Sequence, residues 1–309
     1  MDAQSTPVIS VTDLRKSYGD VRAVDGITFK VDRGEVFGLL GPNGAGKTTT
    51  IEILEGLNNS DTGKVSVLGL DPASDNIKLK ERIGVQLQTA ALYPNLTVVE
   101  LIDVFRSFYS HSRPTSELVS EFGLEERQTG LTKELSGGQR QRLSVALAMV
   151  NDPELIFLDE PTTGLDPQAR RSLWDRVAAL KNEGRTVVMT THYMEEAEQL
   201  CDRVAIMDHG HILESGTVSD VISSHFKDRT IRFTTRAELD DARLADLRAV
   251  TRVTHEEDET VLYTTDVPAT IVDLERLGQE SSQNEIDVAV KRPTLEDVFL
   301  ELTGRALRD

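Results

Sequence analysis

The sequence predicts an α/β fold, a largely parallel sheet wrapped by helices. Short β-rich runs alternate with helical stretches between residues 8 and about 216, the order typical of such a fold. A glycine-rich loop follows the apolar run 36–40 and precedes a helical stretch, a context that suits phosphate binding. A second apolar run, 155–158, ends in the two carboxylates Asp159 and Glu160. Both features place polar groups at the carboxyl edge of the sheet, where ligands of such folds bind.

The first two-thirds of the chain supplies most of the predicted elements. Residues 98–150 are expected to be mainly helical, with breaks at Pro114 and Gly123. The apolar runs bounded by turn residues predict buried strands. The predicted strands are 8–11, 27–31, 36–40, 65–68, 83–87, 155–158 and 186–190, and the predicted helices outside 98–150 are 48–57 and 167–183.

After residue 216 the pattern changes to the order β-α-β-β-α-β, the split βαβ arrangement. The expected strands are 230–235, 252–256, 260–265 and 286–290, and the expected helices are 237–247 and 268–277. A last helix, 294–307, is predicted to be amphipathic, with Leu295, Val298, Phe299, Leu302 and Leu307 near one face. The alternative is an irregular extension packed on the main domain. We therefore divide the chain into residues 1–216, with a helical subdomain at about 89–150, and an accessory domain, 217–309.

Composition limits the classes of function. The chain has 309 residues and a formal net charge of −18, which argues weakly against broad nucleic-acid binding, because that needs a basic surface. A single cysteine, Cys201, excludes an intramolecular disulfide and suits a reducing cytoplasm. Residues 1–7 lack a secretory pattern, and no run approaches the ~20 apolar residues of a spanning helix. If the protein works at a membrane, another chain must cross it.

The glycine-rich loop matches the phosphate-loop pattern of a glycine, four residues and Gly-Lys-Ser/Thr. Its glycines let backbone N–H groups face the phosphates, and the following helix adds positive potential. Lys47 is expected to reach the β- and γ-phosphates, and the Thr48 hydroxyl to ligate Mg²⁺. The predicted nucleotide-binding residues here are Gly41, Pro42, Asn43, Gly44, Ala45, Gly46, Lys47, Thr48 and Thr49.

The two carboxylates after the apolar run 155–158 are predicted to have different roles. Neighbouring residues of a strand point to opposite sides, so Asp159 and Glu160 face different surroundings. Asp159 is expected to hold Mg²⁺, directly or through water. Glu160 is expected to polarise the attacking water as general base.

A second glycine-containing segment, Leu135, Ser136, Gly137, Gly138 and Gln139, is typical of a helix start. Ser136 is a suitable cap, and the glycines expose backbone N–H groups, which indicates an anion site. This segment, continued by Arg-Gln-Arg, resembles the signature of the ATP-binding cassette (ABC) ATPases. The resemblance implies that it binds the γ-phosphate of an ATP held by an opposite subunit.

Other positions resemble the same family in the expected order, and the resemblance covers about residues 8–220. Tyr18 matches the aromatic residue that stacks on adenine, although a half-exposed turn tyrosine is the alternative. Gln88 matches the glutamine that contacts Mg²⁺ and water, with Gln86 as a nearby rival. Asp166 matches the centre of the loop that couples two active sites, and His192 matches the histidine that contacts the γ-phosphate.

Two further histidines, His209 and His211, flank a glycine. This spacing suits either a metal site or a hairpin turn between two strands, and the turn is the favoured interpretation.

Residues 92–100 and 293–304 resemble the ATPase subunits of bacterial drug exporters of the daunorubicin-resistance type. The resemblance implies an ATP- and Mg²⁺-dependent ATPase that drives efflux of drugs, antibiotics or lipid-like molecules through a separate transmembrane subunit. It also implies a second ATPase subunit, identical or related, because each motif occurs once. The protein is then expected to be peripheral, on the cytoplasmic side of the cell membrane.

Three alternatives remain open at this point. A non-transport ABC ATPase would act on ribosomes or DNA, but the chain lacks the second ATPase domain, coiled coils or zinc-site cysteines of those classes. An ABC importer ATPase would share all the chemistry. The accessory domain could be a regulatory ligand-binding module, since this arrangement of elements hosts many functions.

Overall fold

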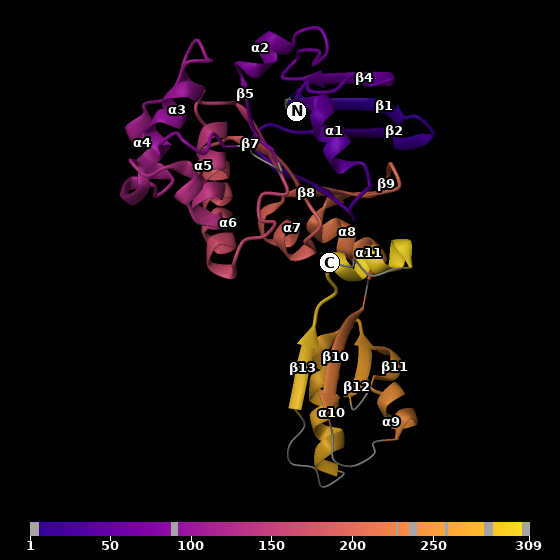
Figure 1. The fold of residues 1–309 in the computed structure, drawn as a ribbon. Coiled ribbons are helices and arrows are strands. Elements are labelled where there is room, and N and C mark those ends of the chain that lie inside the picture. The colour runs from indigo at the N-terminus through magenta and orange to yellow at the C-terminus, as the bar shows by residue number, and fades with distance from the viewer. Residues whose placement is uncertain are drawn as a thin grey trace. The chain divides into compact units, whose positions relative to one another are not determined.

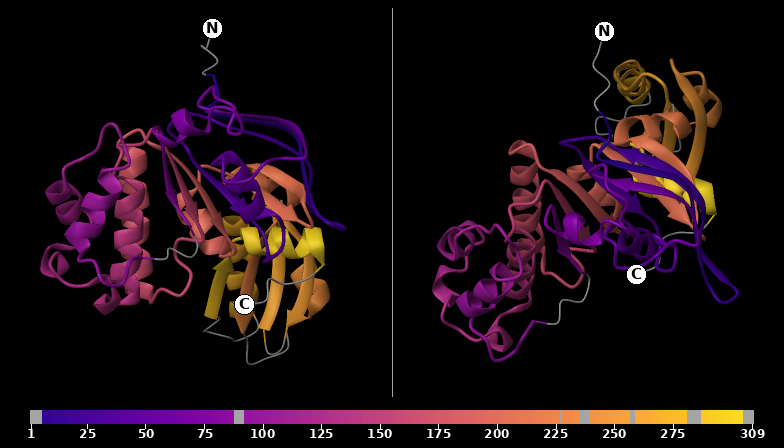
Figure 2. Two further views of the ribbon diagram at one scale, coloured as in Figure 1. Left: turned by 45° about the horizontal axis from the view of Figure 1, so that its top comes forward. Right: turned by 90° about the horizontal axis from the view of Figure 1, so that it is seen from above.

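A computed structural model describes residues 6–87, 92–226, 228–234, 240–256, 259–280 and 287–304 of the chain. These residues form two compact units, one ending at Val218 and the other covering Ser219–Gly304. Figures 1 and 2 show the elements of each unit.

The first unit is built around a mostly parallel sheet. In the described residues its strand order is β5-β6-β7-β3-β8-β9, and only β9 runs antiparallel to its neighbour. Every residue of β3, β6 and β7 is buried, which explains why these strands read as continuous apolar runs. The predicted parallel sheet is therefore confirmed. The strands are β3 (Val36–Leu40), β5 (Ile83–Gln86), β6 (Leu155–Asp159), β7 (Thr186–Thr191), β8 (Arg203–Asp208) and β9 (His211–Thr217).

A second, antiparallel sheet has the order β2-β1-β4. Its strands β1 (Ile9–Tyr18) and β2 (Val21–Val31) are much longer than the runs 8–11 and 27–31 that the sequence predicted. The added lengths are polar: Arg15 lies opposite Asp25 in the register and forms an ion pair with it. A charged hairpin carries no apolar pattern, so the sequence did not reveal it. The third strand is β4 (Thr62–Val67).

The helices that flank the parallel sheet follow the glycine and proline signals closely. Helix α1 (Lys47–Leu54) ends before Gly56, whose φ of 70° favours glycine, so the predicted end at residue 57 is too late. Helix α6 (Pro167–Asn182) has proline in its first turn. The short helices α2 (Asn76–Lys80) and α7 (Met194–Leu200) complete this set.

The segment predicted to be mainly helical contains α3 (Val98–Arg106), α4 (Thr115–Glu121) and α5 (Gly137–Ala148). Two 3₁₀ turns, Glu125–Arg127 and Thr132–Glu134, lie between α4 and α5. Figure 1 shows these three helices grouped beside α6.

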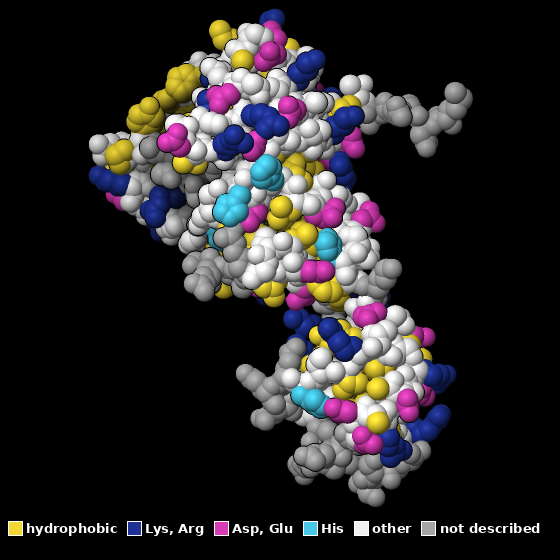
Figure 3. Space-filling view, turned by 90° about the vertical axis from the view of Figure 1, so that its right-hand side faces the viewer, with side chains coloured by type: hydrophobic (Ala, Val, Ile, Leu, Met, Phe, Trp, Pro, Cys, Tyr) yellow, Lys and Arg dark blue, Asp and Glu magenta, His cyan; other side chains and the backbone are white. Residues whose placement is uncertain are grey.

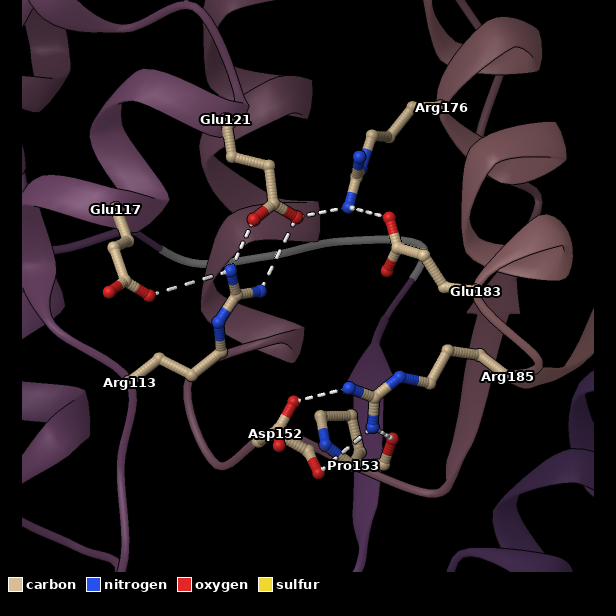
Figure 4. A network of polar contacts seen from close by, with 8 residues as sticks. All are labelled: Arg113, Glu117, Glu121, Asp152, Pro153, Arg176, Glu183 and Arg185. Atoms are coloured by element: carbon tan, nitrogen blue, oxygen red, sulfur yellow. Dashed lines mark hydrogen bonds and ion pairs between the residues drawn. The ribbon is translucent and has the colours of Figure 1, made fainter.

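Ion pairs connect this helical group to α6, as Figure 4 shows. Glu121 of α4 accepts hydrogen bonds from Arg113 and from Arg176 of α6. The same Arg176 lies 3.6 Å from Glu183, whereas Glu117 lies 3.9 Å from Arg113 and is mostly exposed. Glu121 thus joins two guanidinium groups that come from separate parts of the unit.

The described elements of the second unit follow the order β-α-β-β-α-β that the sequence predicts. Its described strands form one antiparallel sheet in the order β11-β12-β10-β13. Its apolar core lies between this sheet and the helices α9 and α10. In chain order the elements are α8 (Val218–His225), β10 (Arg229–Thr234), α9 (Asp241–Ala245), β11 (Val250–Glu256), β12 (Glu259–Thr264), α10 (Val267–Glu280), β13 (Asp287–Lys291) and α11 (Leu295–Thr303).

Two helix lengths in this unit differ from the prediction. Helix α9 runs from Asp241, with Asp240 as its cap, to Ala245, and residues 237–239 of the predicted helix lie outside the described residues. Helix α11 ends at Thr303 and is capped by Gly304, which adopts the left-handed conformation at φ 67°. Leu307 lies outside the described residues.

Two expectations about the whole chain can be compared with the described part. None of its helices combines the length and apolar character needed to cross a bilayer. Cys201 is buried, and burial raises the pKa of its thiol. Cys201 is therefore a core residue with little thiolate character.

Candidate functional site

The phosphate loop lies where the sequence placed it, between β3 and α1 at the carboxyl edge of the parallel sheet. Its glycines adopt conformations that other residues avoid: φ is 147° at Gly41, 81° at Gly44 and 102° at Gly46. A Cβ atom at Gly41 would lie 2.1 Å from the Met207 carbonyl oxygen, and one at Gly46 would lie 2.3 Å from that of Ala23. Backbone geometry and close packing therefore both require glycine at these two positions.

This loop forms one wall of a cavity of about 570 Å³. A cavity of this size accommodates a nucleotide-sized ligand. Its lining comes from the β1–β2 hairpin, the phosphate loop, the end of β6 and the β8–β9 turn. The lining residues are Tyr18, Val21, Arg22, Ala23, Asn43, Gly44, Ala45, Gly46, Lys47, Thr48, Thr49, Glu160 and His209.

Lys47 is buried in the floor of this cavity. Its Nζ donates hydrogen bonds to the carbonyl oxygens of Gly41 at 2.8 Å and Pro42 at 3.1 Å. Burial lowers the pKa of Lys47, and the neighbouring carboxylate of Glu160 opposes that shift. A cation held in place by loop carbonyls is positioned to receive phosphate oxygens.

Asp159 and Thr48 come together beside Lys47. Asp159 is 3% exposed, and it accepts a hydrogen bond from the hydroxyl group of Thr190. Burial raises the pKa of Asp159, while the Thr190 hydrogen bond lowers it. Hydroxyl and carboxylate groups are the oxygen donors that Mg²⁺ prefers, so these two residues fit the predicted cation role.

Glu160 lies between Lys47 and His192. Its Oε1 is 3.4 Å from Lys47 Nζ, and its Oε2 is 3.3 Å from His192 Nδ1. The hydroxyl group of Thr163 donates to Oε2 at 3.2 Å. The backbone of Glu160 has φ 45° and is held there by hydrogen bonds from its N–H to the carbonyl and hydroxyl oxygens of Thr190. A non-glycine residue fixed in this conformation is characteristic of functional sites.

The signature segment begins α5 as the sequence predicted. Ser136 accepts from the Gln139 N–H at 3.2 Å, and the Gln139 side chain accepts from the Ser136 N–H at 2.9 Å, a complete capping box. A Cβ at Gly138 would approach Ala169 to 3.1 Å. A Cβ at Gly137 would meet no atom of the described residues within 4 Å beyond its own helix turn and chain neighbours. Gly137 is therefore not required by packing within this chain.

None of the cavity-lining residues comes from Leu135, Ser136, Gly137, Gly138 or Gln139. The structure thus does not bring the signature segment into the cavity of its own phosphate loop. The predicted anion site at the start of α5 would therefore need a ligand held elsewhere.

The remaining predicted site residues differ in where they lie relative to the cavity. Tyr18 lines the cavity and is 48% exposed. Asp166 caps α6 by accepting from the Ala169 N–H at 2.9 Å. Gln88 lies outside the described residues, and its rival Gln86 is buried, with its side chain donating to the Leu87 carbonyl at 2.7 Å.

Sequence reasoning missed several lining residues and one organising residue. Four lining residues reach the cavity only through the tertiary fold, so no local sequence pattern predicted them. They are Val21, Arg22, Ala23 and His209. Thr190 contacts both Asp159 and Glu160 because β7 runs beside β6. Its position two residues before His192 was the available signal.

His209 belongs to the β8–β9 hairpin, which confirms the turn interpretation. Asp208 pairs with His211 in the register, and His209 and Gly210 both have positive φ, as in the tight turns that join antiparallel strands. In the part of the chain that the structure describes, no three or more His, Cys, Asp and Glu side chains are grouped so that they could hold a metal ion.

The arrangement combines a phosphate cradle, a buried lysine, a cation-binding pair and a carboxylate next to a histidine. Such a set can bind a nucleoside triphosphate and polarise a water molecule for attack on its terminal phosphate.

Comparison with protein families supports this chemistry. The family described as "ABC transporter" matches residues 24–163. A shorter match, residues 133–196, is to the family described as "AAA domain, putative AbiEii toxin, Type IV TA system".

Several curated proteins match along nearly the whole chain. The chain is 39% identical to the daunorubicin resistance ATP-binding protein DrrA3 of Streptomyces coeruleorubidus, with 96% of each covered. It is 36% identical to the linearmycin resistance ATP-binding protein LnrL of Bacillus subtilis (strain 168), covering 98% of this chain and all of LnrL. It is also 36% identical to the Nod factor export ATP-binding protein I of Ralstonia nicotianae, covering 99% and 96%.

Solved structures match a smaller part of the chain. One, described as an ATP-binding subunit of an ABC transporter, has a TM-score of 0.64, 32% identity and coverage of 71% of this chain and 93% of its own. Another, a dimeric ATP-binding cassette bound to ADP and Pi after hydrolysis, has a TM-score of 0.62, 25% identity and coverage of 68% and 98%.

Proposed function

Because the chain belongs to the ABC transporter family as one of its ATP-binding subunits, we propose that it is the ATPase of an exporter. In this proposal, ATP hydrolysis drives efflux of drugs, antibiotics or lipid-like molecules through a separate transmembrane subunit. The three relatives described above are named for drug resistance or export and match almost end to end. They support export as the direction of transport.

The observation that carries the catalytic part of the proposal is the position of Glu160. Its carboxylate lies within 3.4 Å of both Lys47 and His192, at the edge of the nucleotide-sized cavity. In the proposed mechanism Glu160 orients and deprotonates the attacking water, while Lys47 and His192 hold the γ-phosphate. Tyr18 stacks on the adenine ring from the outer wall of the cavity.

Thr48 and Asp159 are proposed to hold Mg²⁺, with Gln88 as a further contact. Their side chains supply hydroxyl and carboxylate oxygens, which fits an oxygen-donor set. Bound Mg²⁺ would neutralise charge on the phosphates. The other proposed roles in ATP hydrolysis belong to side chains of the protein: Glu160 for the attacking water, and Lys47 and His192 for the γ-phosphate.

We propose that two ATPase subunits meet head to tail. The signature segment does not line the cavity of its own chain, so a partner's segment would complete each site. Asp166, at the start of α6, would lie near the partner and couple the two sites. Loss of the γ-phosphate contacts then lets the pair open, a two-state change that can drive alternating access in the membrane subunit.

The proposal is tested by purifying the tagged chain from membranes of its native cell in mild detergent. A polytopic membrane protein in near-stoichiometric amount, with ATP-dependent efflux after reconstitution, is the expected result. Uptake in place of efflux would identify an importer. Recovery with ribosomal or DNA-bound proteins, and no membrane subunit, would overturn the transport role and leave the ATPase chemistry intact.

A further inference from the structure

The second unit contains a cavity of its own, with a volume of about 670 Å³. One wall is the face of the four-stranded sheet that does not contact α9 and α10. Ile231 and Phe233 of β10 point into the apolar core, so Thr230 and Arg232, which alternate with them, point to the opposite face. The complete lining consists of Ser224, His225, Phe226, Asp228, Thr230, Arg232, Arg252, Tyr263, Lys291, Arg292, Pro293, Asp297, Leu300 and Glu301.

The strand register places four of these residues in one row across the sheet. Arg252 of β11 lies opposite Tyr263 of β12, Tyr263 lies opposite Thr230 of β10, and Thr230 lies opposite Lys291 of β13. Residues opposite one another on the same face have neighbouring side chains. The two ends of the row are therefore cationic, with an aromatic ring and a hydroxyl group between them.

The carboxylates around this cavity already have partners. Asp297 belongs to the capping box of α11, where it accepts from the Thr294 N–H at 2.8 Å. Asp228 accepts from the Thr251 hydroxyl at 2.5 Å, and Glu301 lies 3.6 Å from the His225 ring. In contrast, Arg252 and Arg292 form no ion pair with any carboxylate of the described residues. The cavity thus has two guanidinium groups left to receive an anion, in a chain of net charge −18.

Arg252 is also held in place. Its guanidinium carbon lies 3.8 Å from the centroid of the Tyr263 ring, a stacking distance. Stacking occupies the flat face of the guanidinium group and leaves the N–H donors at its edge for a ligand. Apolar side chains of Phe226, Pro293 and Leu300 line the same cavity. Figure 3 shows dark blue Lys and Arg side chains beside yellow hydrophobic ones on this unit.

We propose that this cavity binds a small organic anion, a phosphate or carboxylate group joined to an apolar body. Arg252 and Arg292 bind the anionic group, since guanidinium groups match phosphate and carboxylate oxygens in pairs. Phe226, Tyr263 and Leu300 contact the body. The volume lies within the range of known small-molecule sites. This site is separate from the nucleotide cavity and goes beyond the ATPase function.

The test uses phenyl phosphate as the probe in isothermal titration of the full chain, with ADP and Mg²⁺ saturating the nucleotide site. We expect saturable one-to-one binding and no binding of benzyl alcohol, which has the ring without the charge. The double variant Arg252→Gln/Arg292→Gln is expected to lower the affinity at least about 10-fold. Arg252→Lys keeps the charge and loses the planar stack, so it should have an intermediate affinity.

Arg276→Gln is the matched control, because Arg276 is exposed in the same unit and does not line the cavity. Circular dichroism confirms that each variant is folded. Absence of saturable binding, or equal affinity of the double variant and the wild type, overturns the proposal. Sedimentation with phosphatidylglycerol vesicles separates a lipid surface from a free ligand. Vesicle binding that needs Arg252 and Arg292, without phenyl phosphate binding, would also overturn it. None of these outcomes depends on transport, so the exporter proposal is tested separately.

Discussion

The ammonium group of Lys47 lies 3.4 Å from Glu160 Oε1, and both side chains are almost completely buried. The phosphate loop and the residue that follows β6 are therefore joined by a charged contact inside the nucleotide cavity. Each residue is proposed to act on the same phosphate from a different side. Replacing Lys47 should therefore weaken ATP binding, whereas replacing Glu160 should slow ATP hydrolysis and leave ATP binding intact.

Glu160→Gln is expected to retain ATP binding and to lower turnover by about 100-fold or more, the usual contribution of a general base. It should also accumulate a dimer held together by ATP, which size-exclusion chromatography detects. Glu154→Gln is the control: Glu154 pairs with Arg82 at the opposite end of β6. Near wild-type hydrolysis by Glu160→Gln would show that another group is the base.

Lys47→Ala is expected to weaken ATP binding by about 10- to 100-fold, because a hydrogen bond to a charged group contributes about 1.5–3 kcal/mol. Equilibrium binding of a fluorescent ATP analogue measures this effect. Lys181→Ala removes a partly exposed lysine that pairs with Asp202 outside the cavity, and its affinity should be unchanged. Equal affinities for both variants would refute the assignment of the phosphate loop.

Glu55 should make stability depend on pH. Burial, together with the nearby carboxylates of Asp159 and Glu52, raises the pKa of Glu55 to about 9, and neither carboxylate oxygen has a hydrogen-bond partner in the described residues. Between its ordinary pKa and about 9, the folded state keeps a proton that the unfolded state releases. The free energy of unfolding therefore falls as pH rises through this window.

Glu55→Gln removes that titration. Its free energy of unfolding should exceed that of the wild type by a margin that grows with pH, by up to about 1.4 kcal/mol per unit. Urea unfolding at pH 5, 7 and 8.5 measures the margin. A difference that stays constant with pH would mean that Glu55 is ionised in the folded protein.

Glu121→Ala should destabilise the first unit by about 2 kcal/mol. The change leaves Arg113 and Arg176 partly buried, at 19% and 17% side-chain exposure, without the carboxylate that both contact. Glu117→Ala is the matched control from the same helix, because Glu117 is 59% exposed and 3.9 Å from Arg113. It should change stability by less than about 0.5 kcal/mol. Equal losses in urea unfolding would contradict a special role for Glu121.

The sequence predicted those parts of the site in which function and local structure use the same residues. Gly41 and Gly46 predict both a tight turn and a phosphate-binding loop. Ser136 predicts both a helix cap and an anion site. The apolar runs before Gly41 and Asp159 predict strands of the sheet. Parallel strands that are buried on both faces are apolar at nearly every position, so they are easy to recognise in a sequence.

The sequence did not predict parts that depend on contacts between distant segments. Thr190 fixes Glu160 only because β7 pairs with β6, and His209 reaches the cavity only because the β8–β9 turn lies beside the phosphate loop. The polar length of the β1–β2 hairpin was missed for a related reason, since Arg15 and Asp25 satisfy each other across the strands.

The open space around Gly137 bears on why a glycine stands at this position. This chain has room for a methyl group at that position, and its backbone needs no special angle there. Alanine favours a helix interior over glycine by up to about 1 kcal/mol, so the stability of the single subunit does not explain this glycine. In the proposed pair of subunits this space would face the partner's ligand, so a Gly137→Ala subunit that is no less stable alone should hydrolyse ATP more slowly in its complex.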